Sequence, residues 1–228
     1  MKRIVLLLTI SCLFIGANAQ WVINPYSFGG TPVIPDTAKF NFSLSARPVS
    51  GWYNFVMTSR ADQTLFSGTD QGITITTTAA SGTNWTPEGT SPAATSAQNS
   101  APASTLAGWP GDVGLDYAFN KKSAAPANAA AEHWTVSGLT PFATYKFEWL
   151  GSRTTAETSR TCYYTIRDNT GVTTSALHEA KGNTSTIVTL TGVANASGIV
   201  YLSGYGGGTT ANSLYVYYNA LKIYKVTP

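Results

Sequence analysis

Short runs along the chain alternate strictly between apolar and polar residues. Phe40, Phe42 and Leu44 alternate with polar neighbours, and the same period of two recurs in Ile73–Thr76 and in Tyr145–Trp149. A period of two predicts strands with one buried face. Related patterns predict further strands at 51–57, 115–119, 161–167, 172–178, 185–190, 199–203 and 214–226.

Turn-forming residues separate these runs, most clearly at Asp168–Gly171, Lys181–Asn183 and Asn195–Gly198. Apolar residues at helical spacing never extend beyond two or three turns, and Ala127–His133 is the one candidate for a short helix. About ten short strands at this spacing predict an all-β fold, a β-sandwich or a barrel.

The first 19 residues have the features of an export signal. Lys2 and Arg3 precede an apolar stretch, and Ala17-Asn18-Ala19 forms an A-x-A cleavage site. We expect cleavage before Gln20 and a secreted protein at the cell surface, in the extracellular medium or in the periplasm. The apolar stretch is shorter than the roughly 20 residues of a membrane helix, so we expect no membrane span.

Charge and cysteine content narrow the function further. Charged residues make up 11% of the chain, against roughly 25% in an average soluble domain. Loss of Lys2 and Arg3 lowers the formal net charge from +3 to +1, which gives no support to binding of nucleic acid or of an anionic membrane. Cys162 is then the single cysteine, so no intrachain disulfide forms. Its alternation with Tyr164 and Ile166 predicts a buried thiol.

Composition divides the remaining chain into an arm and a domain. Residues 20–37 form a proline-rich N-terminal arm, and residues 38–228 form a single β domain with a long low-complexity loop at 79–107. Trp85 lies in that loop and Trp109 just after it, among the turn residues Gly108, Pro110 and Gly111. Two readings stay open: the rings cover the open end of the fold, or they form a binding platform.

Catalytic motifs are missing from the sequence. It contains no G-x-S-x-G elbow, HExxH, P-loop or EF-hand, and two histidines are too few for a typical zinc site. Four carboxylates, Asp112, Asp116, Glu148 and Glu157, could pair for glycoside hydrolysis. Spacing alone does not show such a pair. We therefore expect a protein that is not an enzyme, with a glycan-active hydrolase as the less favoured alternative.

Several short motifs resemble known families. Trp134–Pro141 followed by Tyr145 resembles the core of a fibronectin type III domain, where a tyrosine hydroxyl bonds back to the upstream backbone. A broader set resembles the galactose-binding-like β-sandwich domains of secreted Bacteroidota proteins, which often accompany carbohydrate-active enzymes or adhesins. This set comprises Gly51–Asn54, Gly151–Arg153, Tyr164–Ile166, Gly182–Ser185 and Tyr218–Ile223.

The resemblance implies a jelly-roll sandwich, an extracellular location and glycan binding. It also implies the structural calcium that such domains often carry. The sequence matches none of the calcium ligands, so we predict no cofactor and leave calcium open.

Two functions follow. The first is a non-catalytic module that binds a glycan, with aromatic rings for stacking and polar groups for the hydroxyls. Its candidate ligand-binding residues are Trp85, Trp109, Asp112, Arg153, Arg160, Tyr205 and Asn212. For the two arginines, an exposed charge whose stem covers apolar surface is the competing reading.

The second function is a structural or adhesive protein that assembles with copies of itself into an oligomer or a fibre. Segment 214–226 carries tyrosines on both faces and could pair with another chain if it lies at a sheet edge. In the arm, Asp36-Thr37-Ala38 resembles the O-glycosylation signal of exported Bacteroidota proteins, which makes Thr37 a candidate modification site.

Overall fold

The computed structural model describes residues 37–44, 48–57, 67–77, 85–86, 108–110, 113, 118–121, 132–153, 159–208 and 215–227. Contacts divide the chain into two units, residues 1–35 and residues 36–228. All described residues belong to the second unit. Its described residues contain no helix long and apolar enough to cross a membrane.

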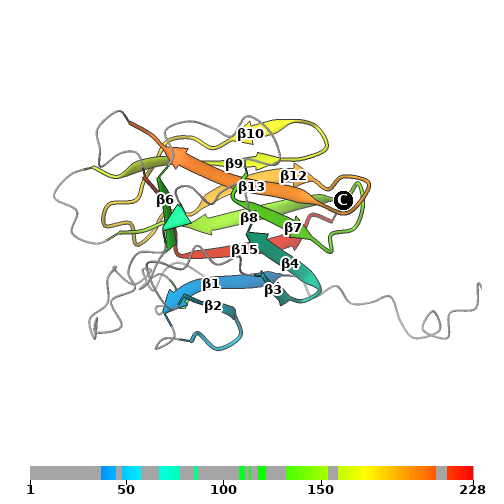
Figure 1. Ribbon diagram of the computed structural model, residues 1–228, viewed down its shortest axis with the longest axis horizontal. Coiled ribbons are helices and arrows are strands. Elements are labelled where there is room, and N and C mark those ends of the chain that lie inside the picture. The colour runs from blue at the N-terminus through cyan, green and yellow to red at the C-terminus, as the bar shows by residue number, and fades with distance from the viewer. Residues whose placement is uncertain are drawn as a thin grey trace, which may run out of the picture. The chain divides into compact units, whose positions relative to one another are not determined.

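A five-stranded sheet joins the first and last strands of the domain. Its order is β12 (Val188–Val193), β8 (Thr144–Leu150), β15 (Ala220–Lys225), β1 (Ala38–Leu44) and β2 (Tyr53–Met57). β1 and β2 run parallel, whereas the other pairs are antiparallel. Figure 1 shows β1 beside β15, although they lie at opposite ends of the colour scale.

A second sheet is antiparallel throughout. Its order is β10 (Val172–Thr174), β9 (Thr161–Arg167), β13 (Val200–Gly206), β7 (Trp134–Ser137), β4 (Ile73–Thr77) and β3 (Ser67–Asp70), and β11 (His178–Glu179) also pairs with β9. A third, small sheet contains β14 (Tyr215–Tyr218), β6 (Ala118–Lys121) and β5 (Trp85–Thr86).

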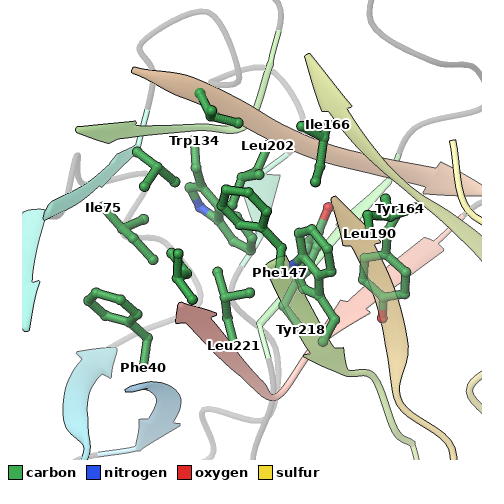
Figure 2. Close-up of a cluster of buried hydrophobic side chains, with 14 of the residues drawn as sticks. Phe40, Ile75, Trp134, Phe147, Tyr164, Ile166, Leu190, Leu202, Tyr218 and Leu221 are labelled. Carbon is green, nitrogen blue, oxygen red and sulfur yellow. The ribbon is translucent and has the colours of Figure 1, made fainter. Parts of the chain in front are cut away.

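Large apolar side chains from the two main sheets meet in one core. They include Phe40, Ile75, Trp134, Phe147, Tyr164, Leu202 and Leu221, which point toward one another in Figure 2. The apolar positions of the predicted alternation supply this core, and their polar neighbours face outward. The prediction of an all-β sandwich is therefore confirmed.

The predicted final strand 214–226 is two strands that belong to different sheets. Asn219 separates them: its side-chain oxygen accepts a 2.6 Å bond from the Ser152 N–H, and its own N–H donates to the Leu150 carbonyl. β15 then lies between β8 and β1. The premise that this segment forms a sheet edge is therefore wrong for β15, because both of its edges are already paired.

Other local predictions have mixed outcomes. The hydroxyl of Tyr145 accepts a 2.9 Å hydrogen bond from the backbone N–H of Thr140, the contact expected of a tyrosine corner. Cys162 is buried, as expected. Segment 172–178 contains the short strand β10 and the start of β11 rather than one strand. The predicted signal segment, most of the loop 79–107 and residues 127–131 of the predicted helix lie outside the described residues.

Candidate functional site

The predicted ligand-binding residues with described side chains lie in three different places. Trp109, Arg153, Arg160 and Tyr205 have described side chains. Trp85 lies in β5, where only its backbone is described, and Asp112 and Asn212 lie outside the described residues.

Trp109 is buried, which favours the reading of a covering ring over that of a binding platform. The side chain is only 7% exposed and packs with Trp52 in a small cluster that also contains Val113 and Leu150. Gly108 has a φ of +76°, a left-handed conformation that glycine adopts without strain. The turn therefore folds the indole back onto the protein, so the first of the two readings, a covering ring, holds for Trp109.

A lysine lies against this tryptophan pair. Lys222 projects from β15, and its ammonium nitrogen is 4.3 Å from the ring centroid of Trp109 and 5.8 Å from that of Trp52. The two indole centroids are 5.4 Å apart. Burial lowers the pKa of Lys222, while the nearby charge of Glu148 opposes that shift. The indoles thus hold a largely buried cation through cation–π attraction.

The two predicted arginines come together beside Tyr217 of β14. Arg153 donates a 3.1 Å hydrogen bond to the Tyr217 hydroxyl, and its guanidinium carbon is 5.6 Å from the ring centroid. Burial raises the pKa of Tyr217, and the positive charges of Arg153 and Arg160 act against that rise. Arg160 itself is buried. The charged head of Arg153 thus contacts Tyr217 directly, which differs from the competing reading of an exposed charge whose stem covers apolar surface.

Glu179 organises the backbone around this arginine cluster. Its carboxylate accepts hydrogen bonds from the N–H groups of Arg160 and Lys181, at 2.7 and 3.0 Å, and from the hydroxyl of Ser159. Burial works against the charged form, but these bonds outweigh it and lower the pKa of Glu179. The carboxylate therefore stays ionised and fixes the segment before β9.

Tyr205 lies on the outer face of the second sheet. Cys162, Tyr164 and Ile166 of β9 point into the core, so the residues between them face outward. Tyr205 of β13 stands directly opposite Tyr163 in register, and their rings stack with centroids 5.0 Å apart and an interplanar angle of 27°. Both rings are half-buried, and neither hydroxyl hydrogen-bonds to any residue of the described chain.

A third tyrosine continues this outer face. Tyr201 stands opposite Arg167 in register, and the short side chains of Thr165 and Ser203 occupy the row between it and the tyrosine pair. Glycines 206–208 follow Tyr205 directly, so small residues also flank the pair along β13. We call Tyr163, Tyr201 and Tyr205 the tyrosine face.

Sequence reasoning found Tyr205 but missed its partners. Tyr163 alternates with the buried Cys162 and Tyr164, and that alternation could have indicated an outward ring. For Lys222 the sequence offered no signal, since a lysine in a strand ordinarily predicts an exposed charge.

The histidines have structural contacts. His178 donates from Nε2 to the Gly151 carbonyl at 2.8 Å, and burial lowers its pKa. Nδ1 of His133 lies 2.9 Å from the Tyr218 hydroxyl. Within the described ranges, no group of three or more His, Cys, Asp or Glu could hold a metal ion. Glu148 accepts a 2.6 Å hydrogen bond from Tyr224, whereas the other three candidate catalytic carboxylates lie outside those ranges.

Comparison with known proteins gives few matches. No protein-family model matches the chain, and no curated protein matches its sequence. Similar solved structures include the CBM22-1 and GH10 modules of Clostridium thermocellum endo-1,4-beta-D-xylanase 10B complexed with xylohexaose, at 13% identity and a TM-score of 0.31, covering 50% of this chain and 22% of that one. Another is the CBM22-1 xylan-binding domain of a Paenibacillus barcinonensis protein, at 12% identity and a TM-score of 0.32, covering 75% of this chain and 91% of that one. A likeness at this level does not identify what the chain binds.

Proposed function

We propose that the chain is a secreted, non-catalytic module that binds a glycan through the tyrosine face. The observation that carries this proposal is the stacked pair of Tyr163 and Tyr205, half-buried on the outer face of a rigid antiparallel sheet. Sugars present C–H surfaces that pack on aromatic rings, and a phenol hydroxyl can bond to a sugar hydroxyl. Tyr201 extends the same face along β13.

The geometry of the face suits this role. Tyr163 and Tyr205 are fixed by strand pairing, so binding would order little of the protein and would cost little conformational entropy. Thr165 and Ser203, in the row between Tyr201 and the pair, are fully buried. The surface offered to a sugar is therefore that of the stacked rings themselves.

A glycan array followed by titration calorimetry tests the proposal. Tyr205→Ala should weaken binding of the best glycan at least tenfold, as loss of a central aromatic contact does, without altering the fold. Phe142→Ala is the matched control: Phe142 is 63% exposed in the turn between β7 and β8, away from β9 and β13. This control should bind as the parent protein does.

Two results would overturn the proposal. One is the absence of binding to any glycan on the array. The other is undiminished binding by Tyr205→Ala and by the double variant Tyr163→Ala/Tyr205→Ala. If light scattering at the same time showed an oligomer whose size grows with concentration, the alternative of self-assembly would take its place.

Export and modification are part of the proposal. Mass spectrometry of the exported protein should show a chain that begins at Gln20. Thr37 is partly buried and directly precedes β1, and we propose it as the O-glycosylation site. Thr37→Ala should remove one glycan mass from protein made in its natural host.

A further inference from the structure

A largely buried lysine side chain on the five-stranded sheet has no hydrogen-bond acceptor among the described residues. Lys222 is 8% exposed, and it forms neither a hydrogen bond nor an ion pair with any residue of the described chain. Its contacts are the rings of Trp52 and Trp109. A lysine ammonium has three N–H donors, and none of them has an acceptor in the described part of the chain.

The charges around Lys222 come from both neighbouring strands. In register, Lys222 of β15 stands between Lys39 of β1 and Glu148 of β8. One row further along the same face, Lys146 lies over the ring of Tyr224. Three lysines therefore lie around Glu148, one of whose oxygens already accepts the Tyr224 hydroxyl. A second carboxylate, that of Asp70, accepts the backbone N–H of Lys39 at 2.7 Å, so lysines outnumber the described carboxylates here by one.

The described residues leave one side of the ammonium uncovered. Gly108 is exposed, and a Cβ at this position would lie 3.0 Å from the Lys222 nitrogen and within 4 Å of no other atom of the described chain outside its immediate neighbours. The space that a side chain would fill at residue 108 thus borders the ammonium directly. An acceptor atom that approached the nitrogen from this side would lie within hydrogen-bond reach of it.

We propose that Lys222, held between Trp52 and Trp109, binds an oxyanion carried by a sugar, either the carboxylate of a uronate or a sulfate ester. The anion supplies the missing acceptors, and the positive charge of Lys39 adds to its attraction. The indoles hold the ammonium in place and are themselves too buried to stack on the ligand. This inference rests on the proposed function because it assumes that the ligand is a glycan. Its site lies on the five-stranded sheet, whereas the tyrosine face lies on the second sheet.

Calorimetry with defined oligosaccharides tests the site. The probes are oligogalacturonate for the carboxylate, a chondroitin sulfate oligosaccharide for the sulfate, and xylohexaose and cellohexaose as neutral sugars. Lys222→Met keeps the length and apolar contacts of the side chain and removes its charge. We expect it to bind the preferred anionic probe at least tenfold more weakly, and we expect parent binding to that probe to weaken as salt increases. Lys181→Met, which removes the same charge from an exposed position, should bind within twofold of the parent.

The outcomes separate this site from the tyrosine face. Loss of anionic binding in Lys222→Met, with a near-ultraviolet circular dichroism spectrum like that of the parent, supports the site even if no neutral sugar binds and the tyrosine face fails. If neither anionic probe binds, or if Lys222→Met binds them as the parent does, the site is refuted. The proposal for the tyrosine face would still stand in that case, provided that Tyr205→Ala loses binding to a neutral sugar.

Discussion

Replacing Trp109 with alanine tests the finding that this ring covers the five-stranded sheet. The side chain is 7% exposed, and truncating a buried tryptophan costs about 3–5 kcal/mol. Trp109 packs in a small cluster apart from the main core, where neighbours can collapse into the space more easily. We therefore expect the lower end of the range, about 3 kcal/mol of unfolding free energy.

Two interactions account for part of this loss. The tilted contact with Trp52 contributes about 0.5–1.5 kcal/mol beyond its buried area. The cation–π contact with Lys222 contributes about 1–2 kcal/mol, because the ammonium is largely desolvated. A double-mutant cycle of Trp109→Ala with Lys222→Met should therefore show a coupling energy of about 1 kcal/mol or more.

Urea denaturation is the appropriate assay, because it yields the free energy of unfolding directly. With a slope of about 2 kcal/mol per molar, the midpoint should fall by about 1.5 M. Phe142→Ala removes a ring that is 63% exposed and should change the free energy by less than about 0.5 kcal/mol. A loss below about 1 kcal/mol for Trp109→Ala, with unchanged fluorescence from Trp52, would refute the assignment of Trp109 as a covering ring.

Three further predictions concern individual side chains. The buried Thr165 hydroxyl has no hydrogen-bond partner among the described residues, so Thr165→Val should stabilise the protein by up to about 1 kcal/mol in the same urea assay. Asp168 accepts bonds from the N–H groups of Val193, Thr170 and Gly171, which outweigh burial and lower its pKa below 3.8. Asp168→Asn should therefore cost about 1–2 kcal/mol near pH 7, and urea titrations across pH should show this difference disappearing as the pH falls through the lowered pKa. Burial raises the pKa of Cys162 to about 12; Cys162→Ala should cost about 1 kcal/mol, and reductant should not shift the melting temperature.

The alternation of apolar residues predicted most of the fold because one buried face leaves a clear period of two. A strand was predicted at 161–167, and β9 has the same bounds in the structure. β3, with the sequence Ser-Gly-Thr-Asp, has no apolar residue to reveal it. The pairing of strands could not be predicted from the sequence either, since nothing in Phe40 or Tyr53 indicates that their strands run parallel.

The candidate sites were only partly predictable, because a local pattern does not show which distant residues a side chain contacts. Gly108 and Pro110 predict a turn at Trp109, but a turn does not define which way the ring points. The spacing of Arg153 and Arg160 did place both at one strand end, and they meet at Tyr217. The position of Lys222 depends on residues from three distant segments, and such contacts leave no local pattern.

The place of β15 in its sheet also determines when this protein can fold. β15 is the last of the described strands, yet it lies between β8 and β1, the first of them. A chain still emerging from the ribosome therefore carries β1 and β2 without the strand that connects them to the rest of their sheet. Contacts between such distant segments slow folding, to milliseconds or seconds for β-sandwiches. Until β15 has been made, β1 and β8 lack the strand that lies between them, and exposed apolar surface of this kind favours aggregation.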